Sequence, residues 1–132
     1  MKIAFFGSSL VSSYWNGAAT YYRGMLKGLA ALGHDITFYE PDAFERQQHR
    51  DIADPHWARV VVYPATADAW QAAVADAAGS CDLMVKASGV GVFDAELEEI
   101  IPQICPARAL SAYWDVDAPA TLAAIDADPR HH

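Results

Sequence analysis

Short apolar runs alternate with longer amphipathic stretches along this chain, which is typical of βα units and of a parallel sheet. Five runs predict strands, over residues 2–6, 35–39, 59–63, 82–87 and 109–114. No hairpin turn introduces any of them, and the VVV and LMV runs predict strands that are covered on both faces. We therefore predict an α/β fold: a Rossmann-like, three-layer α/β/α sandwich whose mainly parallel sheet of about five strands has the order 3-2-1-4-5.

The stretches between these runs predict four helices. The first has its apolar residues on one face, with Asn16 as N-cap and Gly33 as its end. Gly24 and Gly28 lie one turn apart in it and lower its helix propensity, which predicts that the helix packs closely on the sheet there. The other helices are predicted over residues 67–78, over 95–101 as far as Pro102, and from Ala118 onward.

The organisation of the chain predicts one domain that belongs to a larger protein. With 132 residues, 53% of them hydrophobic, the chain can bury one core but is short for a two-domain enzyme. Residues 41–57 are polar and rich in Arg, Gln and His, and they predict the longest irregular connection. The helix that starts at Ala118 has little room before Asp128-Pro129, which is unlike the end of a domain. We expect residues 1–132 to be a single, incomplete Rossmann-like domain of a two-domain protein.

Charge and cysteine usage exclude several classes of partner. The formal net charge is −8 and the nine Lys and Arg residues are scattered, so we expect no nucleic-acid partner. The start MKIAFF is too short for a signal sequence or a membrane span, so we expect no membrane span and a cytoplasmic location. Cys81 and Cys105 lack the spacing of a zinc site or a redox pair, so we expect reduced thiols.

Ligands of an open parallel sheet bind at the carboxyl ends of the strands, beside the point where the strand order reverses. That point selects two loops, residues 7–17 and 87–93. The first lacks both common glycine-rich phosphate motifs, but it offers four serine hydroxyls, the rings of Tyr14 and Trp15, and helix N-terminal amides. Such a surface suits sugars and other polyols. Alternatively, the serines only satisfy the backbone of the turn and Trp15 packs on the domain.

The second loop and the end of the fifth strand carry further candidates. Gly89, beside Ser88, lets the backbone approach a ligand closely, and Lys86 either neutralises an anion or reaches solvent. Asp115 ends the fifth strand, so we expect its carboxylate to face the cleft. Asp115 and Asp117 have the form of a cation-binding DxD pair, but Asp117 is explained as a helix N-cap, and we expect no metal there.

The stretch WNGAATYYRGMLKGLAALGHDITFYEPD, with the Gly-containing loop before it, resembles the amino-terminal half of the two-domain, GT-B fold glycosyltransferases. Those proteins begin with a strand, a Gly-containing loop, a long helix and a GH turn into the second strand, which here is Gly33-His34-Asp35-Ile36. The closer likeness is to the bacterial, spore-maturation (CgeB-like) group of glycosyltransferase-like proteins. The stretches FYEPDAFERQQHRD, KASGVGVFD and WDVDAP carry it, so the resemblance covers nearly the whole chain.

This resemblance implies that the chain is the acceptor-side domain of a transferase that moves a sugar from a nucleotide-sugar donor to an acceptor. In that family the carboxyl-terminal domain, which is missing here, holds most of the nucleotide-sugar, so we expect this fragment to bind no cofactor and to be inactive alone. No catalytic base is assigned. With the loops identified above, we expect the substrate to contact Gly7, Ser8, Ser9, Ser13, Trp15, Asn16, Gly17, Ser88, Gly89 and Asp115.

Two other functions remain open on the residues alone. A flavodoxin-like redox module would use the Ser-rich loop to hold the phosphate of FMN, with Tyr14 or Trp15 stacked on the flavin ring. A non-catalytic small-ligand or interaction domain would use the same loops without chemistry. The exposed edges of an incomplete sheet also predict that two copies can pair as a homodimer.

Overall fold

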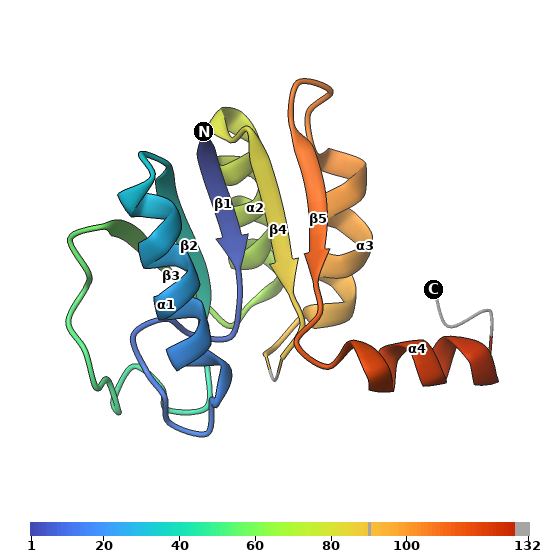
Figure 1. Cartoon of the computed structure of the whole chain (residues 1–132), viewed down its shortest axis with the longest axis horizontal. Helices are drawn as coiled ribbons and strands as arrows, with labels where there is room; N and C mark the ends of the chain where they lie inside the picture. Colours follow the sequence, from blue (N-terminus) through green and yellow to red (C-terminus); the bar gives the residue numbers. More distant parts are fainter. Residues whose placement is uncertain (90, 129–132) are drawn as a thin grey trace.

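Five parallel strands form one sheet in the computed structural model, which describes residues 1–89 and 91–128 (Figure 1). Along the sheet the order is β3-β2-β1-β4-β5, and every neighbouring pair is parallel. The predicted α/β, Rossmann-like fold and its strand order are therefore confirmed. The strands are β1 (Lys2–Phe6), β2 (Asp35–Asp42), β3 (Ala58–Pro64), β4 (Leu83–Ala87) and β5 (Leu110–Trp114).

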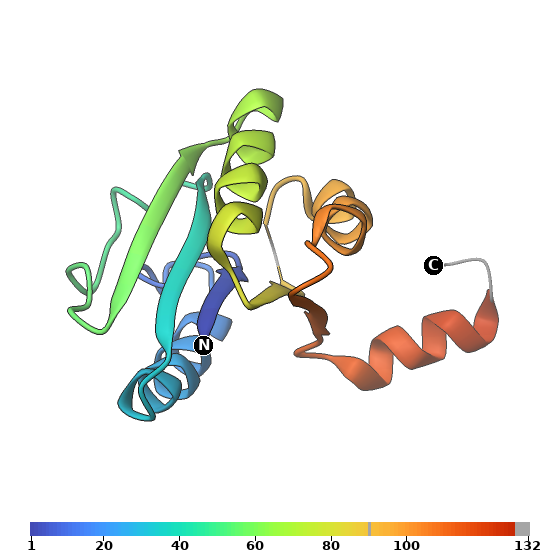
Figure 2. The ribbon, with the colours of Figure 1, turned by 90° about the horizontal axis from the view of Figure 1, so that it is seen from above.

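Helices cover the two faces of the sheet unequally. The helices are α1 (Ala18–Ala31), α2 (Ala67–Ser80), α3 (Asp94–Ile104) and α4 (Ala118–Ala127). Seen from above, α1 lies on one face and α2 and α3 lie on the other, while α4 extends past the β5 edge (Figure 2). Within the described residues, no helix is long and apolar enough to cross a membrane.

Each face of the sheet carries its own apolar core, because side chains alternate between the faces along every strand. On the α1 face, Phe5 and Phe38 stack with ring centroids 5.5 Å apart and Tyr22 of α1 packs on both rings. On the opposite face, Phe6 stacks on Tyr39 at 4.6 Å, and the side chains of α2 and α3 cover them. The alternation of β1 residues thus fixes both layers of the sandwich.

Two predictions about α1 were wrong in detail. The N-cap is Gly17 rather than Asn16, whose side chain turns back into the preceding loop. Gly24 and Gly28 do not mark close packing, because a Cβ added to either glycine would meet nothing within 4 Å. Both glycines face solvent, so they only lower the helix propensity of α1.

Four elements extend beyond their predicted ends, namely β2, β3, α3 and α2, which reaches Ser80 instead of residue 78. Strand β2 continues through Pro41 to Asp42, because β3 pairs with it as far as Pro64. Helix α3 passes Pro102, where it was predicted to end, and reaches Ile104. The proline costs the helix one backbone hydrogen bond, but buried Ile101 anchors the last turn and accepts a 3.0 Å bond from the amide of Cys105.

The sheet is incompletely covered at β5. All five residues of β5 are exposed, and α4 has no buried residue. The predicted three-layer arrangement therefore holds for β1 and its neighbours, whereas β5 lacks a helix of the described chain on its α1 side. Helix α4 ends at Ala127, and Pro129 lies outside the described residues.

Candidate functional site

The serine-rich loop between β1 and α1 is closed on itself. Asn16 is at its centre: its amide nitrogen donates to the carbonyls of Ser9 and Ser12, at 2.9 and 3.0 Å. Its side-chain oxygen accepts a 2.8 Å hydrogen bond from the hydroxyl of Ser8. All four residues are buried. Asn16 is therefore the centre of an internal network rather than a helix cap.

A buried carboxylate supports the same loop from β2. Glu40 is completely buried and accepts hydrogen bonds from the Ser9 hydroxyl at 2.8 Å and from the Leu10 amide at 2.6 Å. The side chain of Gln47 donates a third, at 2.6 Å. Three donors satisfy this carboxylate, which is how proteins accommodate an acid without water. The hydroxyl of Ser9 is thus occupied by a hydrogen bond within the protein.

A buried arginine joins the loop to the connection between β2 and β3. Arg46 is only 1% exposed, and its guanidinium donates to the backbone carbonyls of Ser8, Tyr14 and Trp15 at 3.2–3.4 Å. Its guanidinium also lies 4.9 Å from the centre of the Phe44 ring. Burial lowers the pKa of Arg46, although an arginine stays protonated in a protein. Arg46 could not be singled out from sequence, because residues 41–57 contain several Arg, Gln and His side chains of similar polar character.

An ion pair on the surface holds the outer part of the loop. Both carboxylate oxygens of Asp51 accept bonds from the guanidinium of Arg23, at 2.7 and 2.9 Å. The amide and the hydroxyl of Ser13 each donate to Asp51 at 3.0 Å. The bonds from Arg23 above all hold the pKa of the Asp51 carboxyl well below its usual range. Ser13 is therefore bound to Asp51.

Of the other predicted residues of this loop, Gly7 is closely packed and Trp15 is exposed. Gly7 has no room for a side chain, because an added Cβ would lie 2.7 Å from the Phe38 ring. Trp15 is 81% exposed and has a left-handed backbone, with φ 46°. Its backbone carbonyl is held by Arg46, so its ring is presented to solvent instead of packing on the domain.

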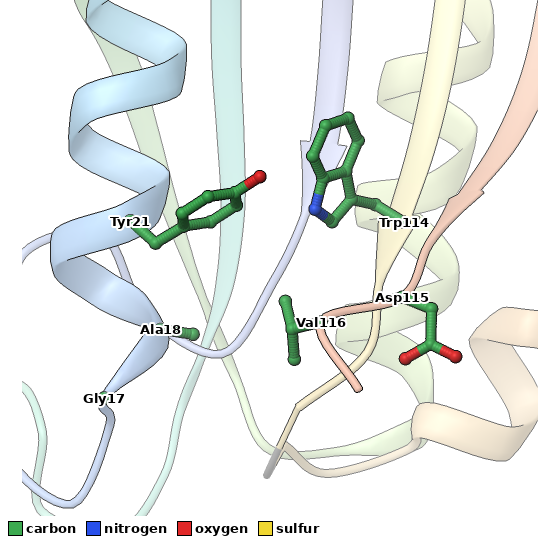
Figure 3. Close-up of a pocket in the computed structure, with 6 residues that line it drawn as sticks. All are labelled: Gly17, Ala18, Tyr21, Trp114, Asp115 and Val116. Carbon is green, nitrogen blue, oxygen red and sulfur yellow. The ribbon is translucent and has the colours of Figure 1, made fainter. Parts of the chain in front are cut away.

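A cavity of about 470 Å³ lies between the start of α1 and the end of β5. Tyr21 and Trp114 form its walls, with ring centroids 6.1 Å apart and planes inclined by 42°. Figure 3 shows the two side chains pointing toward one another from opposite elements, with Val116 below them. We call this space the Tyr21–Trp114 cavity; it is lined by Gly17, Ala18, Tyr21, Trp114, Asp115 and Val116.

Two of the ten predicted substrate contacts, Gly17 and Asp115, line this cavity. Gly17 brings the start of α1 to it, where the first amides have no side-chain cap. The carboxylate of Asp115 turns away from Tyr21 (Figure 3) and accepts hydrogen bonds from Asp117 and Thr121 at the start of α4. Sequence reasoning missed Tyr21 and Trp114, because about ninety residues separate them and only the fold brings their rings together.

Ser88 fixes the floor of the site. Its hydroxyl donates to Asp115 at 3.1 Å and accepts a 2.8 Å bond from the amide of Val116. Its carbonyl accepts a 2.9 Å bond from the hydroxyl of Tyr22. Gly89 follows with φ 151°, a conformation that favours glycine. Ser88 and Gly89 thus position the loop after β5 against α1.

Hydrogen bonds to its side chain lower the pKa of Asp115. The hydroxyl of Thr121 contributes most, followed by the amide of Asp117 and the hydroxyl of Ser88. The amide of Asp117 lies 2.9 Å from the carboxylate. A carboxylate so occupied is ionised at neutral pH and is a weak base. Asp115 therefore organises the turn before α4 and brings negative charge to the rim of the cavity.

Lys86 takes neither of the two roles expected for it. Its side chain is buried, and its ammonium group lies 2.8 Å from Asp94 and 3.9 Å from Glu98. It also donates to the carbonyl of Ala87 at 2.6 Å. Two carboxylates compensate the charge inside the protein, so this lysine neither reaches solvent nor is free to bind an anion.

Metal ligands do not gather in the part of the chain that the structure describes: no three His, Cys, Asp or Glu side chains could hold an ion there. Both cysteines are free thiols, with Cys81 buried. Comparisons with protein-family models, with curated proteins and with solved structures found no match to this chain. Its function therefore has to be inferred from the fold and from the geometry of this site.

Proposed function

We propose that the Tyr21–Trp114 cavity binds a sugar, and that the chain is the acceptor-side domain of a cytoplasmic glycosyltransferase. The observation that supports this proposal is the pair of facing rings, Tyr21 and Trp114, at the carboxyl end of the sheet. In open α/β sheets this end binds the ligand. The sugar would come from a nucleotide-sugar donor that a further, carboxyl-terminal domain holds.

The lining of the cavity has the chemistry that a sugar requires. Aromatic rings offer apolar faces to the C–H groups of a pyranose, while the Tyr21 hydroxyl and the Trp114 indole N–H can bond its hydroxyls. No hydrogen bond to another described residue occupies either polar tip. The volume of about 470 Å³ lies within the usual range of small-ligand sites. One sugar ring, partly open to solvent, fits this description.

The same residues give no catalytic base. Asp115 already accepts bonds from the Ser88 hydroxyl and the Asp117 amide, and its pKa is lowered, so it is a poor proton acceptor. We therefore propose that this domain orients the acceptor and that the donor and the base are supplied from outside it. The isolated chain would bind a sugar without transferring one.

The flavodoxin-like alternative has less support. The four serine hydroxyls that would hold the phosphate of FMN are bonded to Asn16, Glu40, Asp51 and the carbonyl of His49. The described lining of the Tyr21–Trp114 cavity contains a carboxylate and no Lys or Arg. A phosphate dianion would be repelled there. A non-catalytic sugar-binding domain remains compatible with the same cavity.

Saturation-transfer NMR with D-glucose, D-galactose and N-acetyl-D-glucosamine tests the proposal directly. We expect at least one of these sugars to bind, and Trp114→Ala to weaken its binding at least about tenfold by removing one wall. Leu32→Ala, at an exposed position near the end of α1, is the control. Trp15→Ala reports whether the site extends to the serine-rich loop.

Three outcomes would count against a sugar site. Binding of none of the three sugars would reject it, and so would binding that Trp114→Ala leaves unchanged. Quenching of FMN fluorescence by the purified chain would instead support the redox alternative. Should a sugar bind to the cavity, transfer from UDP-glucose by the proposed two-domain protein would distinguish a transferase from a binding domain.

A further inference from the structure

Strand β5 presents an open edge with unpaired backbone groups. The amide of Leu110 bonds to Asp82 and the carbonyl of Trp114 accepts from Ser88, so residues 110, 112 and 114 direct their backbone groups toward β4. In a parallel ladder the intervening residues, Ser111 and Tyr113, then direct theirs outward. The sequence LSAYW contains no charge and no proline that would block pairing.

The other edge of the sheet, β3, differs in composition. Its sequence ARVVVYP includes Arg59 and ends in Pro64, and both residue types discourage pairing between edges. The β3 side chains from Val60 to Val62 are partly buried, whereas every residue of β5 is exposed. Of the two edges, β5 is therefore the one suited to pairing with another strand.

Two apolar surfaces next to this edge lack a partner within the described chain. On the α1 side of β5, Leu110 is 68% exposed, and it lies at the opposite end of the strand from Trp114 and the Tyr21–Trp114 cavity. Helix α4, with the sequence APATLAAIDA, has one charged residue and no buried residue, and its Leu122 is 60% exposed. Each surface has the apolar character that normally packs against another element.

The turn between β5 and α4 prevents these two surfaces from meeting within one chain. Only residues 115–117 connect the elements, and the bonds from Ser88 and from the amide of Asp117 to Asp115 fix their path. Helix α4 consequently leaves beyond the β5 edge, away from the other helices (Figure 2). Folding α4 back onto its own β5 would break these hydrogen bonds.

We propose that a second copy of this chain occupies the surface. Two β5 strands pair antiparallel about a twofold axis, so each α4, which follows the carboxyl end of its own strand, lies on the α1-side face of the partner's sheet at the Leu110 end and leaves the Tyr21–Trp114 cavity open. The direction in which α4 leaves is the direction in which the partner's sheet continues. Such an isologous contact satisfies the outward groups of Ser111 and Tyr113 in both copies at once.

The available area is sufficient for a stable dimer. A helix of ten residues is about 15 Å long and about 11 Å across, so burying half of each α4 against the opposite sheet covers about 1,000 Å² in total. Edge pairing of β5 adds to this value, which meets the lower limit for a specific interface. Charge repulsion between two chains of net charge −8 weakens with salt, so dimerisation is expected to tighten as ionic strength rises.

Light scattering after size-exclusion chromatography tests the dimer in the full chain. We expect a mass of twice 14.3 kDa, dissociating on dilution. Ser111→Pro removes an outward N–H without touching the β4 ladder, and we expect it to raise the dissociation constant at least about tenfold. Ser111→Ala retains the N–H and is the matched control.

A second pair of variants tests the helix contact without altering the strand. Leu122→Lys places a charge in the proposed contact and is expected to weaken the dimer, whereas Leu32→Lys adds the same charge at the exposed position that follows α1. Both positions are exposed in one chain, so both variants should fold. A monomer at the highest soluble concentration would overturn the proposal. A dimer that resists both Ser111→Pro and Leu122→Lys would overturn it too.

Discussion

The β1–α1 loop and the β5–α4 segment both lie at the carboxyl end of the sheet, yet they are built in opposite ways. In the loop, Ser8, Ser9 and Asn16 are buried and bonded to one another or to Glu40. In the β5–α4 segment, every strand residue is exposed and the helix has no buried residue. Polar residues in a loop thus need not be available to a ligand, and apolar residues at the end of a strand need not be buried.

The difference between the two regions follows from the availability of partners. The loop meets β2, which supplies the buried carboxylate of Glu40, and the connection after β2, which supplies the Arg46 guanidinium and the Asp51 ion pair. Buried donors and acceptors must be paired, so the loop becomes rigid. Strand β5 has a neighbour on one side only, and its aromatic residue Trp114 consequently remains accessible at the Tyr21–Trp114 cavity.

Removing Arg46 should have the largest effect on stability. Arg46→Met leaves three backbone carbonyls without their donor, and we expect the free energy of unfolding to fall by about 3 kcal/mol. Arg50→Met, on the same connection but in an exposed pair with Asp54, should cost less than about 1 kcal/mol. Urea unfolding measures both. Equal losses in the two variants would mean that the buried hydrogen bonds of Arg46 stabilise the protein no more than the exposed ion pair of Arg50 does.

Two alanine substitutions should change the free energy of unfolding in opposite directions. Gly7→Ala brings a Cβ to 2.7 Å from the Phe38 ring, and we expect it to cost about 1–3 kcal/mol. Gly28→Ala meets nothing within 4 Å and should stabilise α1 by about 0.5–1 kcal/mol. Thermal unfolding of the two variants gives the comparison. A stable Gly7→Ala protein would show that the loop can shift away from β2.

Lowering the pH should reduce the free energy of unfolding through Asp51, by less than the substitutions above. The pKa of Asp51 is lowered in the folded chain, so its contribution is present above the unfolded value of about 4 and is lost as the pH falls through the folded value. Because the pair with Arg23 is partly exposed, we expect no more than about 1 kcal/mol. Free energies of unfolding determined at decreasing pH measure this contribution of Asp51. Asp51→Asn should flatten this dependence, and Arg23→Met should flatten most of it, because only the two bonds from Ser13 then remain to lower the pKa of Asp51.

The candidate site shows which of its residues could be predicted from the sequence and which could not. The alternation of apolar runs predicted the parallel strands, and the strand order common in such sheets, with right-handed crossovers, then predicted the two loops nearest the reversal point. Gly17 and Asp115, chosen on that basis, do line the Tyr21–Trp114 cavity. Tyr21 could not be chosen from sequence, because on a helix with several apolar residues its exposure depends on which neighbours reach it. Trp114 likewise could not be separated from an ordinary buried strand residue.

The sequence by itself determined the parallel α/β sheet, since strand patterning and right-handed crossovers act locally and leave few arrangements. Only the tertiary structure decided which polar residues are internal. Arg46 reaches carbonyls that lie more than thirty residues earlier in the chain, and Tyr21 meets Trp114 across the sheet. Such contacts depend on the relative positions of distant elements, because burial and hydrogen bonding follow from proximity in space rather than from spacing along the chain.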